Sequence, residues 1–171
     1  MADIQLGPAH GRLLLRTRRE GLAAGLGHDL TIELTRWSAT VRGETAVTAT
    51  IELDSLQVRE GSGGALPLTD TDRRDIGRNA RKVLRVDSYG TATYRSTHVR
   101  TTANGYQVDG SLTLAGATRS VQLTVTTLEA NHYRVIAEIT QSDFGIKPYA
   151  AFFGALKLRD QVAVEIDLEA T

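Results

Sequence analysis

The chain has 171 residues, a length suited to one domain with a hydrophobic core, and we expect a single domain over residues 1–171. Its 20 basic and 20 acidic residues give a formal net charge of zero, which argues against a dedicated nucleic-acid-binding protein, because such proteins carry a basic excess. The absence of cysteine excludes disulfides, thiolate metal sites and thiol nucleophiles.

The N-terminal residues lack the basic segment and the apolar run of about 7–15 residues that are typical of a secretory signal peptide. No apolar run approaches the roughly 20 residues of a membrane-spanning helix. We therefore expect a cytoplasmic protein without an integral membrane span.

Alternating apolar and polar residues predict strands in the first third of the chain. Residues 28–34 alternate as a half-buried strand. The parity of the apolar positions changes at Trp37, which predicts a bulge or sharp bend near Arg36. Residues 45–53 form the next alternating strand, and the glycine-rich residues 61–64 predict a flexible loop.

Residues 69–85 show helical periodicity. Thr69 and Asp72 resemble a capping box at its start, with Asp where Glu or Gln is preferred. The apolar residues that share one helix face are Ile76, Ala80, Val83 and Leu84.

Strands return after the helix. Asn104-Gly105 lies between the alternating residues 91–102 and 106–114, a strong hairpin signal. Further strands are predicted at residues 120–129, 133–140 and 156–170. Successive hairpins favour antiparallel pairing, and closure removes exposed edges. We therefore predict a mainly β protein, an antiparallel eight-stranded barrel with one inserted helix.

The sequence contains no recognised catalytic or phosphate-binding motif. Its four histidines do not have metal-ligand spacing, so we expect no metal, no catalytic residue and no cofactor. The triplet Asp143-Phe144-Gly145 occurs in kinases, but the glycine-rich loop, lysine and catalytic loop that must accompany it are missing. His28 next to Asp29 is either an acid–base pair or a hydrogen-bonded turn at the start of a strand.

The inward faces of the predicted strands carry small aliphatic residues, and aromatic residues make up only 5% of the chain. Eight-stranded barrels are either filled by side chains or hold one small ligand. Small aliphatic residues favour the hollow form.

Several segments resemble the YceI-like family of lipid- or polyisoprenoid-binding, lipocalin-like proteins. The resemblance rests on Gly27-His28-Asp29-Leu30, on Arg73-Arg74-Asp75-Ile76 at the helix start, and on residues 89–96, 110–119 and 142–145. These segments follow the family order from about residue 10 to residue 170.

The resemblance implies a barrel that binds, stores or transports a long apolar lipid without converting it, such as an isoprenoid, a quinone tail or a fatty amide. The residues expected to contact this ligand have inward parity or lie near the last turn: Leu30, Ile32, Leu34, Ile76, Leu84, Tyr94, Leu112, Leu114, Leu123, Val125, Val135, Ile139, Phe144, Phe152 and Phe153. The candidates for contact with a polar head group are His28, Arg74 and Tyr149.

Two alternatives remain open at this point. One is an enzyme that acts on a lipid-like substrate with His28 as acid or base. The other is a stress or scaffold protein with a filled barrel and a protein partner.

The apolar residues 149–153 are predicted to cover one end of the barrel, with Phe144 below them. Exposure of Phe152 and Phe153 would instead favour a homodimer formed through residues 144–153.

Overall fold

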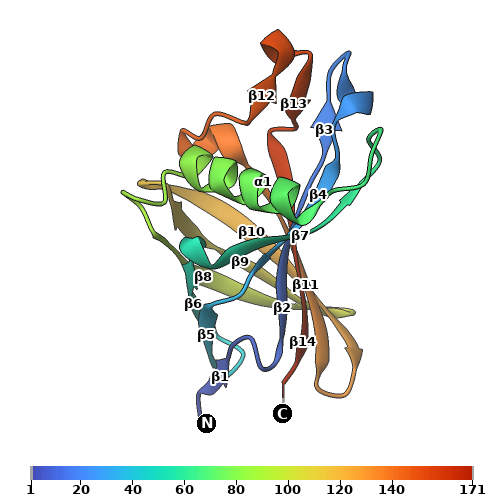
Figure 1. Cartoon of the computed structure of the whole chain (residues 1–171). Helices are drawn as coiled ribbons and strands as arrows, with labels where there is room; N and C mark the ends of the chain where they lie inside the picture. The colour runs from blue at the N-terminus through green and yellow to red at the C-terminus, as the bar shows by residue number, and fades with distance from the viewer. Residues whose placement is uncertain (1, 171) are drawn as a thin grey trace.

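One strongly curled antiparallel sheet of eleven strands makes up most of the molecule, and a single α-helix, α1 (Asp70–Val83), lies across one end of it (Figure 1). The computed structural model describes residues 2–170. Along the sheet the strands follow the order β1 (Ile4–Leu6), β5 (Trp37–Arg42), β6 (Ala46–Glu52), β8 (Thr91–Thr102), β9 (Gly105–Leu114), β10 (Ala117–Glu129), β11 (His132–Thr140), β14 (Gln161–Glu169), β2 (Gly11–Thr17), β4 (Asp29–Leu34) and β7 (Leu56–Ser62). The predicted mainly β, lipocalin-like architecture is confirmed.

A second, three-stranded sheet extends beyond the end that α1 covers. Its order is β12 (Ala150–Ala151), β13 (Leu156–Leu158) and β3 (Arg19–Glu20). Short 3₁₀ turns join several strands: η1 (Ala24–Leu26), η2 (Leu53–Ser55), η3 (Gln141–Phe144) and η4 (Phe152–Gly154).

The predicted number of eight strands is wrong. β2 was not predicted because three consecutive leucines hide its alternation, although Leu13 is buried in the structure. β1 and β3 are too short to show a period. β7 was not predicted either, and it ends at Ser62, inside the segment predicted as a loop. The predicted strand 156–170 is divided between two sheets.

The predicted bend near Arg36 is confirmed and joins the two edges of the main sheet. β4 pairs with β7 at one edge, whereas β5, which follows it in the chain, pairs with β1 at the other edge. The chain then crosses back from β6, near the β1 edge, to β7 at the other edge through η2. The backbone amide of Arg36 donates to Ser55 Oγ at 3.0 Å, and that of Glu52 donates to the Arg36 carbonyl at 3.0 Å. These hydrogen bonds join the bend at Arg36 to the bend at η2 and stabilise both.

The predicted capping box of α1 is also confirmed. The amide of Asp72 donates to Thr69 Oγ1 at 3.1 Å, and the amide of Thr69 donates to Asp72 Oδ2 at 2.9 Å. The bond from the Thr69 amide is the main cause that lowers the pKa of Asp72. At the other end of the helix, Arg81 donates to the Leu56 carbonyl at 2.9 Å, which holds α1 against β7.

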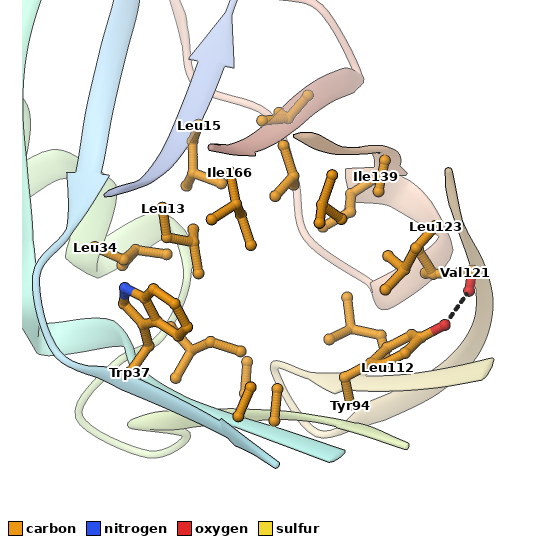
Figure 2. A pocket seen from close by; sticks show the side chains of 18 of the residues that line it. Leu13, Leu15, Leu34, Trp37, Tyr94, Leu112, Val121, Leu123, Ile139 and Ile166 are labelled. Carbon is orange, nitrogen blue, oxygen red and sulfur yellow. Dashed lines mark hydrogen bonds between the residues drawn. The ribbon is translucent and has the colours of Figure 1, made fainter. Parts of the chain in front are cut away.

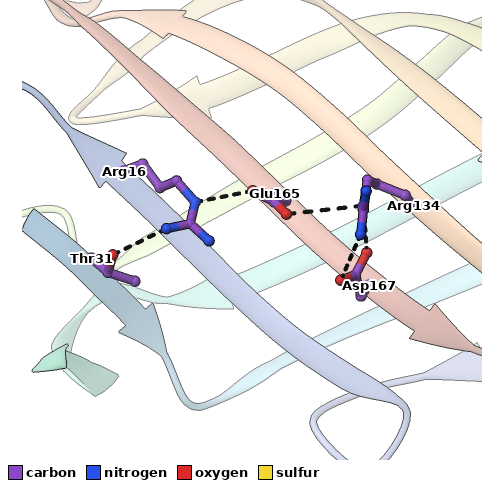
Figure 3. A network of polar contacts seen from close by, with 5 residues as sticks. All are labelled: Arg16, Thr31, Arg134, Glu165 and Asp167. Atoms are coloured by element: carbon purple, nitrogen blue, oxygen red, sulfur yellow. Dashed lines mark hydrogen bonds and ion pairs between the residues drawn. The ribbon is translucent and has the colours of Figure 1, made fainter. Parts of the chain in front are cut away.

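The predicted Asn104-Gly105 hairpin joins β8 and β9, whose register runs from Thr102 opposite Gly105 to Thr93 opposite Thr113. The outer face of the sheet is polar. Arg16 on β2 donates to Glu165 on β14 at 3.0 Å, and Arg134 on β11 donates to Asp167 at 2.8 Å (Figure 3). Polar residues outside and apolar residues inside fix the register of each strand, because a shift by one residue would exchange the faces.

Candidate functional site

A cavity of about 740 Å³ extends through the interior of the curled sheet. Its wall is mostly apolar and is built largely from the inward-facing residues of the strands, as Figure 2 shows for Leu13, Ile139 and Ile166. α1 contributes one helix face to the wall, including Ile76, and Leu84, directly after the helix, also lines it. The volume lies within the usual range of ligand-binding cavities, about 300–1,000 Å³. The structure therefore has a hollow interior.

Most of the residues predicted to contact a ligand line this cavity. They are Leu30, Ile32, Leu34, Ile76, Leu84, Tyr94, Leu112, Leu114, Leu123, Val125, Val135 and Ile139. Their strands bring them together because residues two apart share a face of the sheet.

The three predicted phenylalanines lie elsewhere. Phe144 is buried in the core at 2% exposure but does not line the cavity. Phe152 is 60% exposed and Phe153 is fully exposed, so neither covers the end of the barrel. Both have positive φ angles, 51° and 56°, and this backbone turn directs the segment outward.

Sequence analysis missed further residues of the wall. Leu13 and Leu15 from β2 and Trp37 from β5 line the cavity (Figure 2). So do Val164 and Ile166 from β14. The alternation of β14 was visible in the sequence and would have identified its two residues, whereas the run of leucines in β2 gave no such signal.

Two of the three predicted head-group residues line the cavity, and the third does not. His28 and Tyr149 line the cavity at the end near α1. Arg74 does not line it; its side chain lies on the exposed face of α1 and donates to Thr71 Oγ1 at 3.3 Å. The helix therefore directs Ile76 toward the cavity and Arg74 away from it, as their spacing requires.

His28 is held by the loop that precedes α1. Its Nε2 lies 2.7 Å from the carbonyl oxygen of Leu66, and a carbonyl only accepts, so Nε2 carries the proton of the bond. The neighbouring Asp29 is directed to the other side, where it accepts from the Arg19 amide at 2.9 Å. The two side chains therefore do not form an acid–base pair, and His28 has a structural partner.

Two buried polar atoms of the wall have no hydrogen-bond partner among residues 2–170. They are Thr17 Oγ1, at the end of β2, and Trp37 Nε1, at the start of β5. Both residues line the cavity. A buried polar group without a partner destabilises the fold by about 1–3 kcal/mol, so a ligand group or water that bonds to it is favoured.

Tyr94 provides the opposite case, a buried hydroxyl with a partner inside the wall. Its hydroxyl donates to the carbonyl oxygen of Val121 at 2.9 Å (Figure 2). Burial raises the pKa of Tyr94 to about 12. The ring of Tyr94 therefore presents its apolar surface to the cavity.

The end of the cavity away from α1 has its own polar rim. The Tyr106 hydroxyl donates to Glu44 Oε1 at 3.0 Å, and this bond raises the pKa of Tyr106. Both residues line the cavity, together with Asn131. The interior is thus apolar between two ends that contain polar groups.

Within residues 2–170 no group of three or more His, Asp or Glu side chains has the arrangement of a metal site. In the same part of the chain, no helix has the length and hydropathy needed to cross a membrane.

Comparison with known proteins identifies the family but no curated relative. Residues 5–170 match the model of the YceI-like domain. No curated protein matches the chain.

Several solved structures share the fold at low sequence identity. BcnA of Burkholderia cenocepacia has 18% identity and a TM-score of 0.65, with 96% of this chain and 98% of that chain covered. A polyisoprenoid-binding domain from Saccharophagus degradans has 16% identity and a TM-score of 0.61, with 100% and 99% covered. The YceI protein of Campylobacter jejuni has 14% identity and a TM-score of 0.58, with 81% and 82% covered. With the family model spanning nearly its whole length, the chain belongs to the YceI-like domain family.

Proposed function

We propose that the protein binds one long apolar lipid, of the isoprenoid, quinone-tail or fatty-amide class, inside the cavity, and stores or transports it without chemical conversion. The mostly apolar cavity of about 740 Å³ carries this proposal. A hollow interior disfavours the alternative of a filled-barrel scaffold. The structural similarity to a polyisoprenoid-binding domain supports the choice of ligand class.

The energetics favour a long chain over a short one. Burying each methylene group contributes about 0.8 kcal/mol. Loss of translational and rotational freedom costs about 4–15 kcal/mol, and ordering a flexible chain adds to this. A tail of only a few carbons therefore cannot offset the cost of association, whereas a tail that fills the barrel can do so without many polar anchors.

A polar head group would lie at the end near α1. Thr17 Oγ1 lacks a partner there, and His28 and Tyr149 line the same end. Non-enzymatic binding agrees with the position of His28, whose Nε2 already bonds to a backbone carbonyl. A lipid recovered in chemically altered form would contradict this part of the proposal.

The test is to fill the cavity by substitution. Ala137 on β11 lines the cavity, and Ala49 on β6 lines it from another strand. We expect Ala137→Phe and Ala49→Phe to lower the uptake of a radiolabelled polyisoprenoid by delipidated protein at least tenfold, because the added ring occupies the ligand's volume.

The matched control is Ala163→Phe. Ala163 lies on β14 opposite Glu138, one residue from the partner of Ala137, and faces outward. This variant should bind as the unmodified protein does. Circular dichroism checks that all three variants fold. Unchanged uptake by both folded cavity variants, or no lipid in native mass spectra of protein from its own host, would overturn the proposal.

A further inference from the structure

Three segments at the α1 end of the barrel contain no charged residue. They are residues 21–27, 61–69 and 148–156, which we call the apolar tips. Asp, Glu, Lys and Arg make up 23% of the whole chain. The tips also carry six of the ten exposed large hydrophobic side chains of residues 2–170: Leu22, Leu26, Leu66, Tyr149, Phe152 and Phe153.

Hydrogen bonds join the three tips into one surface. The amide of Ala23 donates to the Ala155 carbonyl at 2.8 Å, which links the first tip to the third. Arg19 donates to the carbonyls of Gly27 at 2.7 Å and Ser62 at 2.9 Å, which links the first tip to the second. Figure 1 shows the β3–η1 segment and the β12–β13 segment extending together beyond α1.

The first and third tips also form the adjacent end of the cavity. Gly27 from the first tip and Tyr149 and Leu156 from the third line it. His28, directly after the first tip, lines it as well. The apolar surface outside is therefore continuous with the apolar wall inside.

The third tip contains two phenylalanines in a strained backbone conformation. Phe152 and Phe153 are consecutive residues with φ of 51° and 56°, a region that non-glycine residues rarely adopt. Phe153 is fully exposed and gains no burial in return. No contact within the described chain offsets the strain at Phe153, so we infer that a contact with another molecule does.

The charge pattern around the tips fits a lipid bilayer. Exposed cationic side chains lie directly behind the first and third tips: Arg18, Lys147, Lys157 and Arg159. Arg18 pairs with Asp29 at 3.7 Å, and Lys157 and Arg159 share the carboxylate of Glu20. Apolar side chains at the outer end, with cations behind them, match the acyl boundary and the headgroup layer of a membrane surface.

We propose that the apolar tips insert into the interfacial region of a lipid bilayer and place the α1 end of the cavity against it. Docking itself is independent of what the cavity holds. Its consequence, that a lipid moves between membrane and cavity without crossing water, rests on the proposed function.

The experiment measures flotation of the full chain with phosphatidylcholine vesicles, with and without phosphatidylglycerol. The double substitution Phe152→Ser with Phe153→Ser should reduce the vesicle-bound fraction at least tenfold. The matched control is Leu128→Ser with Ile136→Ser, which removes two exposed apolar side chains of β10 and β11 outside the tips. The control should change binding less than twofold.

The depth to which the apolar tips insert into the bilayer is measured independently with the variant Phe153→Trp. Bromine-labelled acyl chains should quench this tryptophan in vesicles, whereas Trp37, the one natural tryptophan, lines the cavity and gives the background in unmodified protein. Absence of quenching, or unchanged flotation of the Phe152→Ser, Phe153→Ser variant, overturns docking.

Two further measurements separate this inference from its alternatives. A concentration-dependent dimer that the double substitution abolishes, without vesicle binding by the unmodified chain, would assign the tips to a second copy instead. The double variant should also keep its equilibrium affinity for a detergent-dispersed polyisoprenoid while taking it up from vesicles at least tenfold more slowly. Loss of the affinity itself would assign the tips to the cavity and contradict a docking role.

Discussion

In the barrel wall the Tyr94 side chain packs directly against Gly110. A Cβ atom on Gly110 would lie 2.4 Å from the Tyr94 hydroxyl oxygen and 2.6 Å from the Arg95 carbonyl oxygen. Any side chain at position 110 would therefore displace the ring and break its bond to Val121. The glycine is required here because of this close approach, not because of its backbone freedom.

Tyr94 should give the protein an alkaline sensitivity. Its pKa is raised to about 12 in the folded state, above the value near 10 expected when unfolded. The folded state therefore retains the proton longer, and stability is lost as the pH rises from about 10 to 12. Once Tyr94 is fully ionised, the free energy of unfolding is lower by roughly 3 kcal/mol.

The test is urea denaturation between pH 7 and 11.5. Tyr94→Phe should lower the free energy of unfolding at pH 7 by about 1 kcal/mol, through loss of the bond to Val121. The difference between the two proteins should then shrink above pH 10. Parallel curves for the two proteins would show that Tyr94 does not titrate in this way.

The strands β2, β4 and β7 are linked on their outer face by one carboxylate. Glu33 on β4 accepts from Arg12 on β2 at 2.8 Å and from Arg59 on β7 at 2.9 Å. Its side chain is 13% exposed, far less than those of its partners. The bond from Arg12 is the largest of the causes that lower the pKa of Glu33.

Glu33→Gln should lower the free energy of unfolding by roughly 1 kcal/mol at pH 7, the upper end for partly exposed ion pairs. A lowered folded-state pKa gives a contribution that is present above the unfolded value of about 4.3 and lost as the pH falls below it. The two proteins should therefore become equally stable near pH 2. A constant difference from pH 7 to pH 2 in urea titrations would exclude the ionic contribution.

Sequence patterns predicted elements well where one face is apolar and the other polar. The hairpin of β8 and β9 and the capping box of α1 follow from local chemistry, namely Asn104-Gly105 and the Thr69–Asp72 pair. β2 was missed because Leu14, between two inward leucines, removes the contrast that alternation needs. Parity also placed Leu30 and Leu112 on the cavity wall without any knowledge of pairing.

The direction of the short apolar run at residues 149–153 was not predictable in the same way. Tyr149 lines the cavity, and Phe153, four residues later, is fully exposed. The difference arises from two positive φ angles and from pairing of β13 with β3, a contact between residues more than 130 positions apart. Hydrophobicity alone does not specify such a turn.

For the whole molecule, the cavity makes stability depend on occupancy. A ligand that binds only the folded state at a hundred times its dissociation constant adds about 2.7 kcal/mol to the free energy of unfolding. Extraction of bound lipid should therefore lower the melting temperature measured by scanning calorimetry, and adding a polyisoprenoid back should restore it. Ala137→Phe should show neither change, and equal melting of loaded and extracted protein would contradict ligand linkage.

The bends at Thr35-Arg36 and η2 have a mechanical consequence for the whole barrel. β1 and β7 are the two ends of the hydrogen-bonded order, and the chain joins them through these two bends. Among the described strands no ladder pairs β1 with β7, so the barrel has a seam there, and widening across it would break no strand ladder. If the cavity holds a lipid as proposed, we expect a barrel with such a seam to adjust its inner width, so that one sequence accommodates tails that differ in thickness and branching.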